Sequence, residues 1–158
     1  MSKTRLDSFD RRILGHLQRR GDVGPGELSP LVHLSASQCS RRLQRLKDEK
    51  YIDRIVALLN PERLNLGILA HVMVKLRSHS HENEVRFRER VRILPEVVAC
   101  QGITGDADYI LSIRTHDLAS YNQFLATKLH TAEEIETARS SIVLEEIKST
   151  TELTLDFC

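Results

Sequence analysis

The sequence lacks several features that would assign the protein to a specialised class. Its three cysteines, at 39, 100 and 158, are odd in number, far apart and free of any CxxC pair. This spacing argues against a disulfide framework or a zinc site and favours a reducing compartment. No stretch approaches the ~20 apolar residues of a membrane span, and the N-terminus, MSKTRLDSFD, has charges where a signal peptide needs an apolar run. We therefore expect a soluble, cytoplasmic protein without a membrane partner.

Patterns typical of catalysis and of metal binding are also lacking. No nucleophile, base and orienting group stand in a recognisable arrangement, and Ser141, for instance, falls in a predicted strand rather than on a strained turn. His79 and His81 have no partner set with ligand spacing, so we expect a solvated loop there. The sequence therefore predicts no enzyme, no catalytic residue, no metal and no cofactor.

The distribution of charge is uneven along the chain. Residues 1–60 contain 12 Lys and Arg against 7 Asp and Glu, a net charge of +5, whereas residues 61–158 contain 11 and 15, a net charge of −4. A basic front half followed by an acidic rear half indicates a nucleic-acid-binding module joined to a part that does not bind nucleic acid.

The stretch 28–46, LSPLVHLSASQCSRRLQRL, predicts two helices joined by a tight turn. In the second helix Cys39, Leu43 and Leu46 repeat at i, i+4 and i+7 and so share one apolar side. Two such helices around a common core suit a helix-turn-helix motif, whose second helix enters the DNA major groove. An ordinary helical hairpin with a solvated basic face fits the same pattern.

Capping residues indicate where these helices begin. Ser35 precedes the second helix and Gln38 follows three residues later, the pattern of a capping box. Asp7 is the expected N-cap of an earlier helix that ends near Gly21. Pro30 removes a backbone hydrogen bond, at ~3 kcal/mol in a helix interior. The helix that contains it is therefore expected to be short and kinked, or to begin later.

The β-branched run 51–59 predicts a strand, either a small wing or a connecting arm. We expect a helix-turn-helix DNA-binding domain over 1–60, a linker over 61–67 and a second domain over 68–158. The second domain has the element order βαββαβ, which is ferredoxin-like, so the fold class is α+β. Its strands are expected at 70–77, 97–104, 109–115 and 135–147, with a further short strand at 151–157. Helices that cover one face of this sheet leave the other face to a second copy, so a homodimer is expected.

Several motifs in this order resemble those of one known family. They are Leu6-Asp7-x-x-Asp10, Leu34-Ser35, Arg41-Arg42-Leu43-x-x-Leu46, Pro95-Glu96-Val97, Thr104-Gly105-Asp106-x-Asp108-Tyr109 and Ile142-Val143-Leu144-x-x-Ile147-Lys148. Over most of its length the chain resembles the leucine-responsive/asparagine regulator (Lrp/AsnC) family. The resemblance implies a DNA-binding regulator that dimerises, often assembles into octamers and responds to amino acids. Lys50 departs from the family pattern, which usually has glycine closing the recognition helix.

Six residues are predicted to contact double-stranded DNA. Arg41 and Gln38, together with Ser37, are expected at base edges, because arginine and glutamine can pair bidentately with guanine and adenine. Arg42 and Arg45 are expected to hold phosphates. The full set is Ser35, Ser37, Gln38, Arg41, Arg42 and Arg45, and a solvated surface is the alternative.

The loop 104–108 is the predicted effector site. An amino acid needs an acceptor for its ammonium group and donors for its carboxylate, which an aspartate and backbone N–H groups near Gly105 can supply. An Asx-type turn, in which the aspartates cap only their own backbone, is the alternative. The resemblance favours binding, since the family binds effectors around this loop and the facing last strand. The full set is Gln101, Thr104, Gly105, Asp106, Asp108, Arg139, Ser140 and Ser141.

These observations predict a sequence-specific transcription regulator whose assembly and DNA affinity respond to an amino acid. The effector can shift assembly only by its differential affinity for the two states. An architectural DNA-binding protein without an effector and a small amino-acid-processing enzyme are the rival hypotheses.

Overall fold

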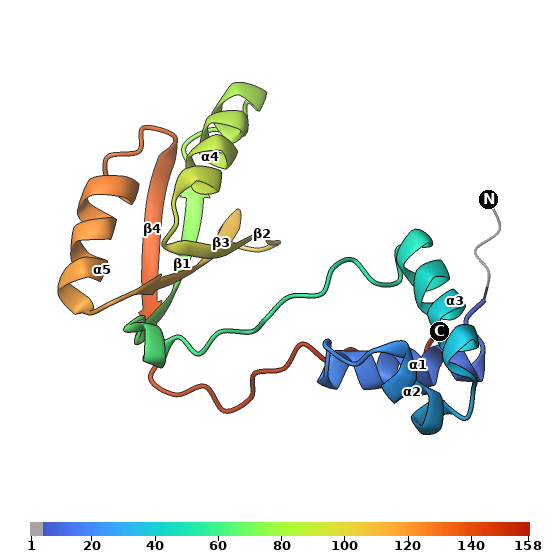
Figure 1. Cartoon of the computed structure of the whole chain (residues 1–158). Helices are drawn as coiled ribbons and strands as arrows, with labels where there is room; N and C mark the ends of the chain where they lie inside the picture. Colours follow the sequence, from blue (N-terminus) through green and yellow to red (C-terminus); the bar gives the residue numbers. More distant parts are fainter. Residues whose placement is uncertain (1–4) are drawn as a thin grey trace. The chain divides into compact units, whose positions relative to one another are not determined.

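The computed structural model describes residues 5–158, so the first four residues of the predicted 1–60 domain lie outside the described part of the chain. The chain forms two compact units (Figure 1). One contains the residues up to Leu59 together with Lys148–Cys158, and the other contains Asn60–Ile147. The N-terminal unit is therefore built from two segments that are far apart in the sequence.

Three helices form the N-terminal unit: α1 (Ser8–Arg19), α2 (Pro25–Val32) and α3 (Ala36–Asp48). Asp7 is the N-cap of α1, as predicted, and Asp10 completes a capping box with it. The apolar sides of the helices meet in one core, which includes the fully buried Cys39 and Leu46 and the nearly buried Leu43. The predicted i, i+4, i+7 repeat of apolar residues in the second helix of the motif, which is α3, is thus confirmed.

Pro30 lies within α2, two residues before its end, so the helix is short, as expected. The prediction of a strand or wing at 51–59 is wrong, because no part of this segment forms a strand, and the alternative of a connecting arm is left. Its β-branched sequence suits a strand, but a strand needs a hydrogen-bonding partner, and the strands in the described part of the chain all belong to the other unit. Lys50, two residues after the end of α3, has a positive φ of 62°.

The C-terminal segment Lys148–Cys158 belongs to the N-terminal unit, which differs from the predicted second domain of 68–158. The short strand predicted at 151–157 is absent from the structure. Instead this segment binds α1 through side chains: Arg11 Nη1 donates to the Cys158 carbonyl at 2.8 Å, and Arg19 pairs with Glu152 at 3.4 Å. Leu155 packs against the helical core.

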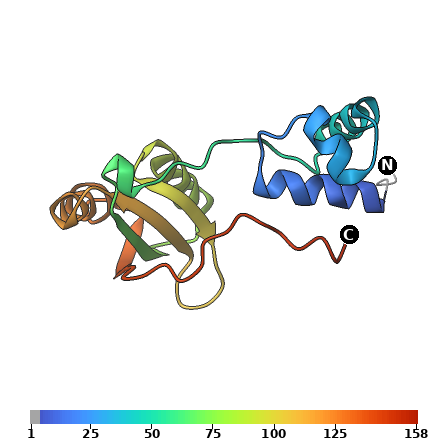
Figure 2. The same ribbon diagram turned by 60° about the horizontal axis from the view of Figure 1, so that its bottom comes forward.

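The second unit has the predicted ferredoxin-like order (Figure 2). After a 3-10 turn at Glu62–Leu64, its elements are β1 (Ile68–Leu76), α4 (His81–Ile93), β2 (Val97–Gly102), β3 (Tyr109–Thr115), α5 (Leu118–Phe124) and β4 (Ile135–Ile142). A single π-helical turn, Leu125–Leu129, extends α5. The strands form one antiparallel sheet in the order β2-β3-β1-β4.

Two predicted strands are longer than the observed ones. The strand predicted over 135–147 ends at Ile142, because its partner β1 begins at Ile68 and the last bond of this edge joins Val143 N–H to the Leu69 carbonyl at 2.9 Å. The strand predicted over 97–104 ends at Gly102. In both cases β propensity continues beyond the residues that have a ladder partner.

The core of the second unit lies between the sheet and its two helices. Val72 and Val74 of β1 are fully buried against Phe87 of α4 and Phe124 of α5. Because side chains alternate along a strand, the intervening His71 and Met73 lie on the opposite face. Met73 is 41% exposed there, so this face is left uncovered by the helices.

Candidate functional site

The helix-turn-helix has the local geometry that the sequence predicts. The Ser35 hydroxyl accepts from Gln38 N–H at 3.2 Å, and Gln38 Oε1 accepts from Ser35 N–H at 2.9 Å, so the capping box is confirmed. His33, at the end of α2, adopts the left-handed conformation that turns the chain toward α3. These contacts fix the start of α3 and the direction in which its first turn points.

The exposed side of α3 carries the residues predicted at base edges. Ser37 and Arg41 are exposed, and Arg41 has no ion-pair partner among residues 5–158. Sequence reasoning missed Ser40 and Gln44, although a helical wheel places both between the apolar side of α3 and the outward Arg41. A shallow hollow of about 680 Å³ is lined by Ser37, Ser40, Arg41, Gln44, Arg45, Asp48 and Glu49.

The structure gives the two arginines predicted at phosphates partners inside the protein. Arg42 Nη1 donates to Asp10 Oδ1 at 2.7 Å and to Asp7 Oδ2 at 2.7 Å. Arg45 Nη2 donates to the other oxygen of Asp10. Asp10 is fully buried, whereas the side chains of Arg42 and Arg45 are 20% and 33% exposed. Ion pairs therefore connect the N-terminal turn of α1 to the middle of α3.

Two members of this cluster, Asp7 and Arg42, are held in their charged forms. Burial opposes ionisation of Asp7, but the Asp10 backbone N–H and the Arg42 guanidinium outweigh it and lower the pKa of Asp7. Burial likewise opposes the charge of Arg42, but its bonds to Asp10 and Asp7 raise the pKa of that guanidinium. A guanidinium bonded to two carboxylates is neutralised locally.

The predicted effector loop connects β2 to β3. Gly105 has a φ of 117°, a conformation that favours glycine, and the space beside its Cα is open. Asp108 is tied to the sheet, because its Oδ2 accepts from Leu76 N–H at 2.7 Å and its own N–H donates to the Val74 carbonyl at 2.9 Å. Its Oδ1 faces His79 Nε2 at 3.8 Å. One oxygen of Asp108 thus has a structural role and the other borders solvent.

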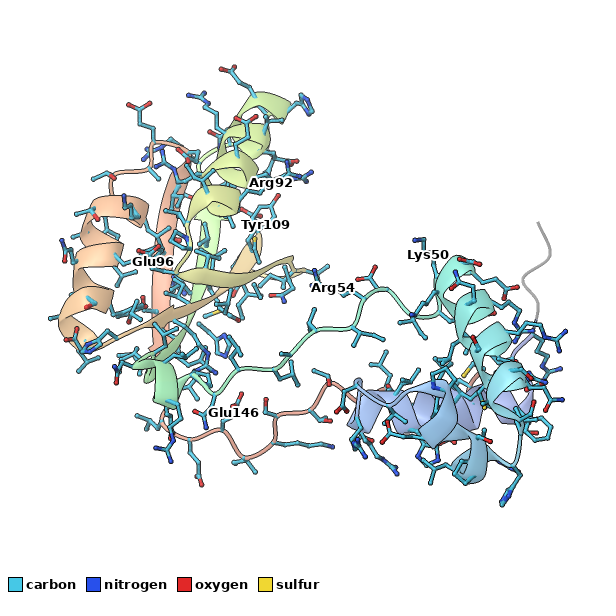
Figure 3. All side chains as sticks on the ribbon, in the orientation of Figure 1. Lys50, Arg54, Arg92, Glu96, Tyr109 and Glu146 are labelled. Atoms are coloured by element: carbon cyan, nitrogen blue, oxygen red, sulfur yellow. The ribbon has the colours of Figure 1, made fainter. Side chains whose placement is uncertain are left out.

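Asp108 also lines a groove between α4 and the edge strand β2. The groove has a volume of about 570 Å³, and Arg92 and Tyr109 lie on its α4 and β3 sides (Figure 3). It is lined by His79, Glu84, Arg88, Val91, Arg92, Cys100, Gly102, Ile103, Asp108 and Tyr109. Sequence reasoning missed Arg88 and Arg92, although their spacing of four residues places them on one side of a helix. The groove combines a carboxylate oxygen with guanidinium donors.

Neighbouring groups set the electrostatics of this groove. The Tyr109 side chain, and then the nearby Glu84, raise the pKa of Arg88, and Glu84 Oε2 accepts from Arg88 Nη2 at 3.3 Å. Burial raises the pKa of the Cys100 thiol, against a smaller opposing effect of Arg88. The Tyr109 ring also packs on Phe87, with centroids 4.6 Å apart. These contacts keep Arg88 cationic and Cys100 neutral at pH 7.

The predicted effector residues on strands come from two opposite edges of the sheet. Arg139, Ser140 and Ser141 lie on β4, whereas Gln101 lies on β2, at the opposite edge of the sheet. Two strands separate these edges, a distance of roughly 14 Å at the usual strand spacing. Ser140 and Ser141 also point to opposite faces, since they pair with the buried Val72 and with His71.

Among residues 5–158 no three His, Cys, Asp or Glu side chains are grouped as a metal site requires. None of the helices in this part of the chain is long and apolar enough to cross a membrane.

The chain thus joins a helix-turn-helix, a motif of DNA-binding proteins, to a ferredoxin-like domain with a groove of mixed charge, which is the architecture of a two-domain regulator. The AsnC-type helix-turn-helix domain matches residues 6–47, and the Lrp/AsnC ligand binding domain matches residues 69–153. The chain therefore belongs to the Lrp/AsnC family of DNA-binding transcription regulators, as its motifs predicted.

Known proteins match the chain over nearly its whole length. The DNA-binding transcriptional activator DecR of Escherichia coli is 33% identical over 151 residues, which cover 96% of this chain and 99% of DecR. A Neisseria meningitidis transcriptional regulator, solved in complex with L-Met, is 38% identical, with a TM-score of 0.94 over 97% of this chain and 99% of that one. An AsnC family regulator from Agrobacterium tumefaciens is 38% identical, with a TM-score of 0.90 over 96% and 99%. Members of the family are transcription regulators and not enzymes.

Proposed function

We propose that the chain regulates transcription by binding specific DNA sites through α3, with an assembly and a DNA affinity that respond to an amino acid. The observation that carries the proposal is the groove beside Asp108, which offers both kinds of group that a free amino acid needs. The guanidinium groups of Arg88 and Arg92 can donate to a carboxylate, and Asp108 Oδ1 can accept from an ammonium group. The similar Neisseria regulator in complex with L-Met supports an amino-acid ligand.

For DNA, the exposed face of α3 supports contact with base edges by Ser37, Gln38 and Arg41. Gln38 Oε1 is engaged in the capping box, so its amide N–H groups are the ones left for an adenine. Ser35 caps the helix, and its place at the helix start favours contact with the DNA backbone. Ser40 and Gln44 join the proposed interface because they line the same hollow.

For the effector, the proposed site combines two parts. The first is the groove and loop of one chain, with Asp108 as the proposed ammonium acceptor and the backbone N–H groups of residues 104–106 as proposed donors to the carboxylate. The second is a β4 edge from a second copy, which would contribute Arg139, Ser140 and Ser141, because β4 and β2 of one chain lie at opposite edges of the sheet. Gln101 lies on β2, on the face of the sheet that the helices leave uncovered.

A homodimer is proposed on the grounds of apolar exposure. Met73 and Val98 of the sheet are 41% and 58% exposed, and Leu58 and Leu59 of the unpaired segment are 75% and 68% exposed. Apolar side chains gathered on a sheet face and on a strand-like segment are typical of an interface with a second chain. Octamers assembled from such dimers are the proposed higher state.

The test is fluorescence anisotropy of the full chain on DNA from upstream of its own gene and on scrambled DNA. Each titration is run with and without a pooled amino-acid mixture, and sedimentation velocity follows assembly in parallel. We expect tighter binding to the upstream DNA and a change in affinity and assembly when the pool is added. Equal affinity for both DNAs, with no effect of the pool, would instead indicate an architectural DNA-binding protein.

A further inference from the structure

The feature that carries a further inference is the buried carboxylate of Asp10. It is fully buried, and both of its oxygens accept hydrogen bonds. Oδ1 accepts from Arg42, and Oδ2 accepts from Arg45 and from Asp7 N–H, the last at 3.1 Å. Because a buried charge without partners is very unfavourable, Asp10 retains these two arginines strongly.

Arg42 also contacts Asp7 and Phe9. Asp7 Oδ2 accepts from the same Nη1 atom, and the guanidinium carbon lies 5.4 Å from the centre of the Phe9 ring. All of these contacts come from the first turn of α1 and the residue before it. A phosphate could bind Arg42 fully only if the arginine left two carboxylates, one of them buried.

The ion pairs of Asp10 also affect the orientation of the α3 face that is proposed to contact DNA. Arg42 and Arg45 are three residues apart and so lie on one side of α3, next to its apolar side. Anchoring both of them to one carboxylate fixes how far α3 is rotated about its own axis. That rotation determines where the outward residues Ser37, Arg41 and Gln44 point.

We propose that Asp10 is a positioning residue for DNA recognition, which keeps Arg42 and Arg45 inside the domain and sets the rotation of α3. Arg42 and Arg45, whose charges are paired inside the domain, then add little to the salt-dependent attraction of this helix for phosphates, while Arg41 remains available to base edges. This inference rests on the proposed contact of α3 with DNA.

The first test compares how DNA affinity of the full chain depends on salt. Log affinity falls with log salt concentration by ~0.9 for each phosphate neutralised. We expect Arg42→Gln to leave this slope within ~0.2 of the native value, whereas loss of an arginine that neutralises a phosphate would reduce it by ~0.9. Arg42→Gln should still lower the ratio of specific to scrambled DNA affinity by about tenfold, because α3 is then less well oriented. A slope reduced by ~0.9 in Arg42→Gln would overturn the proposal while leaving the proposed function intact.

The second test uses Asp10→Asn, with Asp53→Asn as the matched control. Asp53 lies in the same unit and its side chain is 92% exposed, so the control makes the same change of charge at the surface. We expect Asp10→Asn to release the arginines, which steepens the salt slope and lowers the specific-to-scrambled ratio by about tenfold. A folded Asp10→Asn protein with native selectivity would overturn the proposal. If this variant fails to fold, the slope of Arg42→Gln decides. A native chain that binds no DNA would overturn the proposed function itself.

Discussion

Gln18 and Leu153 exchange two hydrogen bonds across 135 residues of sequence: the Gln18 amide donates to the Leu153 carbonyl at 3.1 Å, and Leu153 N–H donates to Gln18 Oε1 at 2.7 Å. These bonds satisfy backbone groups of a segment that has no strand partner. Two residues further on, Leu155 packs on the core of the N-terminal unit, with its Cδ1 atom 4.0 Å from the position of a Cβ on Gly15. The stability of the DNA-binding helices thus depends on contacts with the segment Lys148–Cys158.

Leu155→Ala should reduce the free energy of unfolding of the N-terminal unit by about 1 to 2 kcal/mol, because it removes half-buried apolar surface from that core. Leu153→Ala is the matched control: its side chain is 75% exposed, and its two hydrogen bonds are made by the backbone. We expect the control to change stability by less than ~0.5 kcal/mol. Urea denaturation followed by circular dichroism measures both, and equal effects would contradict the packing role of Leu155.

Lys50→Gly should stabilise the N-terminal unit by about 0.5 to 1 kcal/mol. Lys50 has a φ of 62° at the end of α3 (Figure 3), where a side chain is strained and glycine is not. Lys47→Gly, within the same helix, should instead destabilise by about 1 kcal/mol. Thermal denaturation of both variants checks the difference in sign, and a lower melting temperature for Lys50→Gly would contradict the assignment of strain.

Lowering the pH should remove the contribution of one ion pair, Glu134–Arg90, to the stability of the second unit. The Glu134 side chain is 4% exposed and accepts from Arg90. Burial raises the pKa of this carboxyl, but Arg90 outweighs that effect and brings it below the ordinary value of 4.5. A lowered pKa means that the pair stabilises fully above pH 4.5 and loses its contribution as the pH falls through the folded-state value.

Glu134→Gln should therefore lower stability at pH 7 by about 1 to 2 kcal/mol, since Arg90 remains partly solvated. Melting temperature should then depend less on pH below 4.5 than it does in the native chain. Glu133→Gln, at the exposed neighbouring position, is the control that keeps the native pH profile. Identical profiles for native chain and Glu134→Gln would exclude this pair as the acid-sensitive element.

Arg92→Gln tests the proposed effector groove. A charge-assisted bond to a carboxylate is worth about 1.5 to 3 kcal/mol, so the Kd of a bound amino acid should rise by at least tenfold. Arg86→Gln is the control, because Arg86 lies on the same helix, pairs with Glu82 at 3.3 Å and does not line the groove. Isothermal titration with L-methionine and L-leucine as first probes measures both. Unchanged affinity for Arg92→Gln would place the effector elsewhere.

Local patterns in the sequence were sufficient for the elements whose contacts are local. The repeat of Cys39, Leu43 and Leu46 predicted the buried side of α3, and the Ser35–Gln38 spacing predicted its cap. The partnership of Asp10 with Arg42 and Arg45 was not predictable in this way, because it joins positions 32 and 35 residues apart. The same limit applies to the segment 51–59, whose strand-like composition does not reveal whether a partner strand is present.

The groove shows a further limit. The loop 104–108 was predictable as a candidate site because acidic residues and glycine stand together in the sequence, whereas Arg88 and Arg92 belong to no local motif. What unites them with Asp108 and Tyr109 is the packing of α4 beside the edge of the sheet.

The two-segment construction of the N-terminal unit has a consequence for its biosynthesis. Synthesis proceeds from the N-terminus, so α1, α2 and α3 emerge first, whereas Lys148–Cys158 emerges only after all of Asn60–Ile147. During that interval the α1 surface that later binds Leu153 and Leu155 is bare. A nascent chain therefore completes the packing of its N-terminal unit only after Asn60–Ile147 has been made.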